Sequence, residues 1–255
     1  MRSRVQIRIG MAGWSNPPAK RSERDPKQTH LAYYAEHFSC VEINSSFYRP
    51  HLRATYERWR GETPARFRFS VKMPRSITHE SHLKRCAAEV GRFYEDIAEL
   101  QPKLAAVLVQ LPPGLEFDRR AARAFFSSLP CIRGTRVICE PRHCSWFTRD
   151  AQSVLRRAGV SRAAADPARC PGAELPAGAP RFAYFRWHGA PRMYYSKYSE
   201  IQLAAFAASV RNCKADAVWC IFDNTAGHAA WGDAQRFMAV YAMGAPARPA
   251  PTPPD

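Results

Sequence analysis

Eight short apolar runs recur along the chain, each breaking off into polar residues, and in three of them the polar residues lie two apart. The clearest runs are VEINSSFY (41–48), VICEPRH (137–143) and FAYFRWHG (182–189). Residues i and i+2 of a strand point to the same face of a sheet. We therefore expect three pairs of polar side chains that each project to one side: Glu42 with Asn44, Glu140 with Arg142, and Arg186 with His188.

Strand-like and helix-like segments alternate along the sequence. Strands are expected at residues 5–10, 40–44, 67–72, 104–113, 135–140, 160–166, 182–188 and 217–224. Helices are expected at residues 30–38, 52–62, 83–100, 119–129, 149–159, 200–212 and 231–243. Eight strands with mostly helical connections predict an α/β fold, a single parallel (β/α)8 barrel of the TIM type. A loop rich in Pro, Ala and Gly at about 167–180 follows the weakest strand, so we expect irregular helices in the sixth repeat.

The chain of 255 residues is typical of one such barrel, and we expect a single domain over residues 1–244. The Pro/Ala-rich tail at 245–255 should be disordered, because Pro prevents regular pairing and little surface can be buried. No apolar stretch is long enough for a signal peptide or a membrane span. We therefore expect a cytoplasmic protein with no membrane partner, and its oligomeric state stays open.

Two features of the composition bear on partners and redox state. The eight cysteines have irregular spacings without a C-x-x-C pair, so we expect free and mostly buried thiols, with Cys144 as the candidate for reactivity. The net charge of +16 favours association with nucleic acid. Basic residues are spread over the whole length, however, and no known nucleic-acid module appears. Ordinary solvated arginines explain the same charge.

The ends of the expected strands carry the candidate chemistry, because a parallel barrel gathers these ends at one face. The candidate catalytic residues are Glu42, Lys72, Glu140 and His188. The candidate substrate-binding residues are Trp14, Asn44, Tyr48, Gln110, Arg142, Trp146, Arg186, Tyr195, Asp223 and Asn224. Imidazole suits proton transfer near neutral pH, and Lys72 could bind an anion, pair with a carboxylate or form a Schiff base. Any single member could instead anchor a loop, cap the barrel as packing or form a structural ion pair.

Metal binding is the main alternative for this set of residues. Carboxylates and one histidine are acceptable ligands for a divalent ion. Lys72, Arg142 and Arg186 argue against it, because three cations in one pocket repel a metal ion and attract an anion. We therefore expect no metal. No Gly-rich dinucleotide motif is present, and we expect no cofactor.

Successive motifs along the chain resemble those of the YecE-like family, also called domain of unknown function 72. The motifs are IGMAGWS (9–15), VEINSSFYR (41–49), FRFSVKMPRSITH (67–79), LVQLPP (108–113), CEPRHCSWF (139–147), YFRWHG (184–189), YYSKYS (194–199) and FDNTAGHA (222–229). The resemblance runs in order from about residue 7 to 242 and implies a TIM barrel. It adds His79, His143 and Gly189 to the positions of interest. It implies no activity, because none is established for that family.

Three functions remain open at the level of sequence. The first is a metal-independent enzyme, a hydrolase or lyase, that acts on a small anionic or sugar-like molecule. The second is a barrel that binds nucleic acid or cleaves phosphodiesters. The third is a ligand sensor without turnover.

Overall fold

The architecture is a nearly closed barrel of mostly parallel strands, seen here in a computed structural model that describes residues 5–15, 17, 20 and 23–243. The strands are β1 (Gln6–Ala12), β2 (Cys40–Ile43), β3 (Arg68–Lys72), β4 (Leu104–Gln110), β5 (Arg136–Glu140), β6 (Ser161–Arg162), β7 (Ala164–Asp166), β8 (Ala177–Gly178), β9 (Phe182–Trp187) and β10 (Ala217–Phe222). They form one sheet in the order β7-β9-β10-β1-β2-β3-β4-β5-β6-β8. The expected TIM-type barrel is confirmed.

The sixth strand position is where the barrel departs from regularity. The expected strand at 160–166 is split at Ala163: β6 pairs with β5, and β7 pairs with β9. The two short pieces together bridge the neighbouring strands, so the ring nearly closes. The next connection differs from the expectation too, because residues 167–181 contain β8, antiparallel to β6, and no helix. The Pro- and Gly-rich composition of this segment explains that difference, because both residues disfavour a helix interior.

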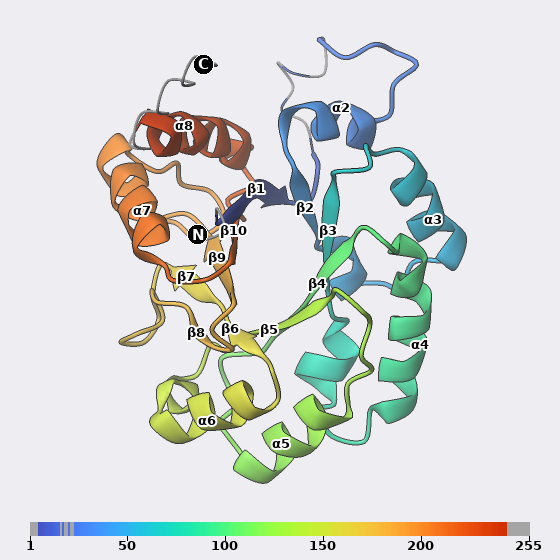
Figure 1. The fold of residues 1–255 in the computed structure, drawn as a ribbon, viewed down its shortest axis with the longest axis vertical. Helices are drawn as coiled ribbons and strands as arrows, with labels where there is room; N and C mark the ends of the chain where they lie inside the picture. The colour runs from blue at the N-terminus through green and yellow to red at the C-terminus, as the bar shows by residue number, and fades with distance from the viewer. Residues whose placement is uncertain (1–4, 16, 18–19, 21–22, 244–255) are drawn as a thin grey trace, which may run out of the picture.

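Helices cover the outside of the barrel (Figure 1). They are α2 (His30–His37), α3 (Arg53–Gly61), α4 (Ala87–Ile97), α5 (Arg119–Ser128), α6 (Arg149–Arg157), α7 (Glu200–Asn212) and α8 (Ala229–Met243). Short helical turns lie at Ser45–Phe47, Ser76–Glu80, Ala98–Leu100 and Cys144–Phe147. Side chains of Thr29, Asp118, Thr148 and Ser199 accept backbone N–H bonds at helix N-termini, which satisfies donors that a helix start leaves free. Helix α4 is shorter than expected, because its first turns are replaced by a loop with three residues at positive φ.

Two separate apolar cores support this arrangement. The larger fills the space between the strands and the helices. The smaller fills the barrel itself and includes Cys40, Leu108, Ile138, Tyr184 and Trp219. The rings of Tyr184 and Trp219 stack with centroids 5.9 Å apart. Large side chains therefore plug the barrel below its C-terminal face, and the next inward positions along the strands are the ones that carry polar groups.

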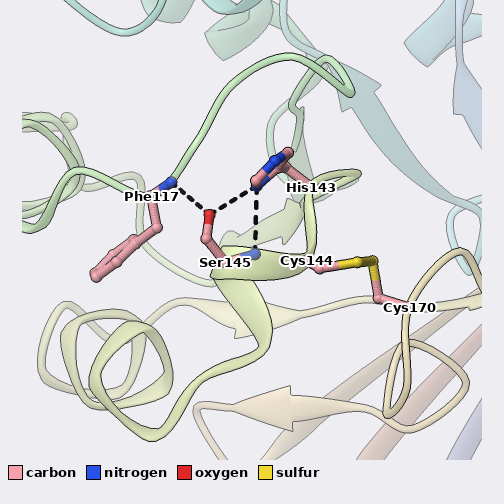
Figure 2. The surroundings of a disulfide bond; sticks show 5 residues. All are labelled: Phe117, His143, Cys144, Ser145 and Cys170. Atoms are coloured by element: carbon pink, nitrogen blue, oxygen red, sulfur yellow. Dashed lines mark hydrogen bonds between the residues drawn. A yellow bond between two sulfur atoms is a disulfide. The ribbon is translucent and has the colours of Figure 1, made fainter.

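A disulfide joins Cys144 to Cys170 with Sγ atoms 2.10 Å apart, so the expectation of free thiols is wrong for these two residues. Figure 2 shows the bond beside the short helix that follows β5, where Ser145 Oγ accepts from the Phe117 backbone N–H at 2.7 Å. This pairing could not be predicted from the sequence, because the cysteines lie 26 residues apart and meet only when β5 and β7 occupy nearby positions. The thiols of Cys40, Cys86, Cys139 and Cys220 are free and buried, as expected.

Two further expectations concern the C-terminal tail and membrane-spanning helices. The tail at 245–255 lies outside the described residues. Among the helices that the structure describes, none is long and apolar enough to cross a bilayer.

Candidate active site at the C-terminal face of the barrel

A cluster of buried charged side chains lies directly above the apolar plug of the barrel. The strand register explains it: Glu42, Glu140 and Arg186 each follow an inward-facing residue by two positions on β2, β5 and β9, and Asp223 does the same just after β10. Glu42, Glu140, Arg186, His188 and Asp223 are all buried. Charged groups are found at this depth only when they are paired or functional.

Arg186 is the centre of this cluster. Its Nε and Nη2 donate to the two oxygens of Glu42 at 3.0 and 2.7 Å, a bidentate pair. Its Nη1 donates to Glu140 Oε2 at 2.5 Å, and its Nη2 also donates to Asp223 Oδ2 at 2.8 Å. The planar guanidinium suits such fixed geometry. Because Arg186 has no exposed surface, its N–H groups serve the carboxylates of the cluster.

His188 and Arg142 complete the network. The ring nitrogens of His188 lie 2.9 Å from Asp223 Oδ2 and 3.0 Å from Glu140 Oε1, so the imidazole bridges two carboxylates. Arg142 Nη2 lies 2.7 Å from Glu140 Oε1 and 3.0 Å from His188 Nε2. The Nε of Arg142 is buried and has no partner among the described residues.

The charges of the network lower the pKa values of two of its carboxyl groups. Burial alone would raise the pKa of Glu140, but Arg142 and Arg186 hold that pKa well below its usual range. Burial likewise opposes ionisation of Asp223, and Arg186 and His188 bring its pKa below the ordinary value. Both carboxyl groups are therefore ionised at neutral pH. A carboxylate held in this state by fixed cations is a poor proton donor.

Lys72, at the end of β3, differs from the other charged residues of this face. Its side chain is 5% exposed, and its Nζ lies 4.0 Å from the centre of the Phe47 ring. Within the described residues, Nζ makes no hydrogen bond or ion pair. Burial and, next, the charge of Arg186 lower the pKa of Lys72 from its ordinary 10.5 to about 8, although the three carboxylates act in the opposite sense.

His79 lies against the same Phe47 ring, with ring centres 4.9 Å apart. Burial, followed by the charges of Lys72 and Arg75, lowers the pKa of His79 to about 4. Its imidazole is therefore neutral at physiological pH, and its Nδ1 lies 2.8 Å from the hydroxyl of Thr78.

A pocket of about 610 Å³ opens beside this cluster, over the ends of β1 and β2. Its lining includes Trp14, Asn44 and Tyr48, together with Ala12, Gly13, Ser15, His30 and Ser45. The Tyr48 ring packs against Phe47 with centres 5.0 Å apart, which connects the pocket wall to the residue beneath Lys72. Asn44 Oδ1 is buried without a partner among the described residues. An aromatic wall with an amide acceptor is typical of sites for polar organic ligands.

Three predicted residues are placed apart from the cluster and the pocket lining. Trp146 is in the apolar core, where its Nε1 donates to the Leu115 carbonyl at 2.9 Å. Asn224 holds a loop, because its Nδ2 donates to Ser196 O and to Asp233 Oδ2. Tyr195 is at the surface under the Arg192 guanidinium. Gln110 differs from these three, because it ends β4 in register with Glu140, two positions after the inward-facing Leu108.

One residue of the site, Tyr184, was missed at the level of sequence. The hydroxyl of Tyr184 donates to Glu42 Oε2 at 2.9 Å and lies 3.0 Å from Ser70 Oγ. Tyr184, Arg186 and His188 follow the same alternation on β9, so the period of two could have found Tyr184. Phe47 is among the aromatic residues that the sequence places beside this face, but its position beneath Lys72 depends on the tertiary packing of a helical turn.

The donor set also bears on metal binding. Across the described part of the chain, no three His, Cys, Asp or Glu side chains are arranged to hold a metal ion. The oxygens of Glu42, Glu140 and Asp223 instead accept from Arg186.

The parallel barrel and the charged cluster at its C-terminal face define a TIM-barrel-like protein with buried charged groups at the end where such folds hold their ligands. The family described as protein of unknown function DUF72 matches residues 8–255, and the chain belongs to that family. The resemblance seen in the sequence motifs is thereby confirmed.

Individual relatives agree with this assignment. The chain is 31% identical over 166 residues to the UPF0759 protein YecE of Escherichia coli K12, a match that covers 63% of this chain and 59% of YecE. It is 29% identical over 154 residues to the UPF0759 protein YunF of Bacillus subtilis, covering 56% and 52% of the two chains. The matched part thus spans little more than half the length of these relatives. A crystal structure of a DUF72 family protein from Thermotoga maritima superposes with a TM-score of 0.78 at 23% identity, covering 93% of this chain and 99% of that chain, which supports the fold.

Proposed function

We propose that the protein is a metal-independent enzyme that acts by acid/base chemistry on a small anionic or sugar-like molecule at the C-terminal face of the barrel. The observation that carries this proposal is Lys72. Its amine lies almost buried at the barrel mouth, has no hydrogen-bond partner among the described residues, and has a pKa lowered to about 8. A group whose pKa lies close to the working pH is the most effective at exchanging protons.

The other residues take supporting roles in this proposal. Arg142 binds the anionic group in this proposal, because it is a buried cation at the C-terminal end of the barrel and its Nε has no partner among the described residues. Arg186, first expected to hold the anion as well, instead fixes the three carboxylates. His188 is fully buried between Glu140 and Asp223, so it is a positioning residue that holds those carboxylates.

The pocket beside the cluster accommodates the rest of the substrate. Trp14 and Tyr48 offer ring faces of the kind that stack on sugars, and the free Oδ1 of Asn44 accepts a hydroxyl. This combination favours a polyhydroxylated or cyclic molecule over an unsubstituted aliphatic one.

The test is a turnover assay with chelator-treated protein and a panel of sugar acids, sugar phosphates and keto acids in D₂O. Proton NMR detects both loss of substrate and exchange of carbon-bound hydrogen for deuterium. We expect activity that survives the chelator and rises with pH through about 8, where Lys72 becomes neutral. Removing a general acid or base typically costs about 10²- to 10⁴-fold in rate, and we expect that loss in Lys72→Met.

The controls separate the roles of individual residues. Lys84→Met removes an exposed lysine that pairs with Asp118 and should leave the rate unchanged. Arg142→Met should raise KM more than it lowers kcat. Turnover that requires an added metal ion, or that is unaffected by Lys72→Met, would contradict the proposal.

A further inference from the structure

Two lysines at opposite ends of the barrel are buried, and they differ in their hydrogen bonds. Lys103, just before β4, donates from Nζ to the carbonyls of Arg60 and Thr63, both at 2.6 Å, and to Thr63 Oγ1 at 3.1 Å. An ammonium has three N–H donors, and all three are satisfied there. Lys72 lies at the other end of the barrel and donates from Nζ to no described residue. Burial lowers the pKa of both lysines, but the first site offers the amine three acceptors and the second offers it none among the described residues.

The carboxylates near Lys72 do not neutralise it, because other cations already hold them. Glu42 is held by Arg186 and by the Tyr184 hydroxyl. Glu140 is held by Arg186, Arg142 and His188, and Asp223 by Arg186 and His188. The network that fixes the carboxylates therefore prevents them from drawing Lys72 into an ion pair. The face of Phe47 covers one side of the amine and excludes water there.

We propose that Lys72 is a nucleophile that condenses with the carbonyl group of a small anionic aldehyde or ketone to form an imine. This inference rests on the proposed function above and specifies its substrate class. The geometry that carries it is a nearly buried amine at the end of β3 that has no hydrogen-bond partner among the described residues. Arg142 follows β5, two strands away at the same end of the barrel, and would bind the carboxylate or phosphate of the same molecule. An amine must be neutral to attack, and a pKa of about 8 leaves an appreciable neutral fraction at physiological pH.

The step balances without an oxidant or reductant. The lone pair of Nζ forms a bond to the carbonyl carbon, and the π electrons of the carbonyl move to its oxygen, which takes up a proton. Loss of that oxygen as water then leaves a carbon–nitrogen double bond. Overall, the lysine ammonium and the carbonyl compound give a protonated imine and one molecule of water. The protonated imine withdraws electrons from the neighbouring carbon, which favours the proton transfers or bond cleavage that acid/base chemistry on this substrate needs.

The experiment uses glyoxylate and pyruvate as probes, the smallest anionic aldehyde and ketone of their kind, with cyanoborohydride to reduce any imine to a stable amine. Intact-protein mass spectrometry should show one adduct, equal in mass to the probe less one oxygen atom, and peptide mapping should place it on Lys72. At about pH 7.5, an amine with a pKa of about 8 is neutral in roughly a quarter of molecules, against about one in a thousand for an ordinary lysine. Labelling of Lys72 should therefore exceed that of exposed lysines.

Several variants sharpen this test. Lys72→Arg and Lys72→Met should both lose the adduct, and Lys84→Met should keep it. Lys103 serves as an internal control within the wild-type chain, since its three hydrogen bonds should leave it unlabelled. Arg142→Met should slow labelling by glyoxylate while leaving labelling by uncharged acetaldehyde unchanged. Labelling spread evenly over exposed lysines, or no adduct on wild-type Lys72, would overturn the imine.

Failure of this inference and failure of the proposed function give different results. Turnover that depends on Lys72 without any trapped adduct would remove the imine and leave the acid/base enzyme standing. A trapped adduct on Lys72 together with turnover that Lys72→Met does not affect would support the imine and remove the proposed role of Lys72 in turnover.

Discussion

Arg186 determines the geometry of the charged cluster, because one guanidinium contacts three carboxylates from three different parts of the barrel. Its hydrogen bonds reach Glu42 on β2, Glu140 on β5 and Asp223 after β10. In a medium of low dielectric constant, carboxylates this close together repel strongly unless a cation lies between them. Arg186 therefore stabilises the fold, whatever role it has in chemistry.

Substituting Arg186 should accordingly destabilise the protein. Arg186→Met leaves Glu42 and part of the charge of Glu140 and Asp223 without compensation, and we expect a loss of about 3 to 5 kcal/mol in the free energy of unfolding. Urea denaturation measures it. The control is Arg58→Met, which removes an exposed pair with Glu62 and should cost about 0.5 kcal/mol or less. Equal stability of the two variants would show that the pairing of Arg186 with the three carboxylates does not stabilise the fold.

Substituting Lys72 should have the opposite effect to substituting Arg186, because the buried amine lowers the stability of the folded protein at neutral pH. Its pKa falls from 10.5 in an ordinary environment to about 8 in the folded protein, so the unfolded chain binds the proton more tightly. The contribution of Lys72 is therefore most favourable above about pH 10.5 and is lost as the pH falls through about 8. At neutral pH the folded state bears a cost on the order of 3 kcal/mol at this side chain.

Lys72→Met should then be at least as stable as the wild type at about pH 7. The advantage should shrink as the pH rises from about 8 to 10.5, because the wild-type amine becomes neutral. Urea denaturation of both proteins across this range measures the difference. A constant difference across the range would mean that the amine is not perturbed by burial.

At the scale of elements, the irregular sixth position is held by a covalent bond. The disulfide joins the turn after β5 to the loop after β7, and Figure 2 shows the hydrogen bonds of the neighbouring His143 and Ser145 in the same turn. Arg142 lies two residues before Cys144, so the bond restrains the segment that carries this guanidinium to the barrel mouth. Short strands β6 and β7 offer few hydrogen bonds of their own, and the link supplements them.

Removing the disulfide should therefore destabilise the protein. For a closed loop of 26 residues, the chain-entropy relation gives about 3 to 4 kcal/mol. We expect that loss for the double variant Cys144→Ser/Cys170→Ser by urea denaturation. The control is Cys131→Ser, which changes an exposed free thiol and should have little effect. A double variant as stable as the control would contradict a restraining role for the bond.

At the scale of the whole molecule, the net charge of +16 is the dominant feature. Positive charge in this excess attracts polyanions from any direction, whereas the pocket and the charged cluster concern one small region. The two properties are therefore separable, and affinity for nucleic acid does not by itself indicate that nucleic acid is the substrate.

We expect weak and sequence-independent binding to duplex DNA, driven by the net charge. The logarithm of the association constant should fall linearly with the logarithm of the salt concentration, with a slope of about −0.9 for each phosphate neutralised. Fluorescence anisotropy with two unrelated duplexes measures both properties. Binding that differs strongly between the duplexes, or that salt hardly weakens, would favour the nucleic-acid function over the small-molecule enzyme.

Much of the fold could be predicted from the sequence because local rules decide it. The helix at 200–212 was predicted with the bounds that α7 has, since Ser199 caps its start and apolar residues recur on one side. The strand at 160–166 was the weakest prediction, and it is the one that splits into β6 and β7. Its two halves pair with different neighbours, and no local pattern encodes that choice.

The alternation of residues by itself determined that Glu42 and Asn44, Glu140 and Arg142, and Arg186 and His188 form pairs that each share one face, because side chains two apart on a strand share a face. Only the tertiary structure decided how their charges are shared. It directs Arg186 onto carboxylates from three elements, leaves the amine of Lys72 without a hydrogen-bond partner among the described residues, and brings Cys144 and Cys170 together. The physical reason is distance: pairing between charges and sulfur atoms depends on a few ångströms of separation between segments far apart in sequence, and barrel closure sets those separations.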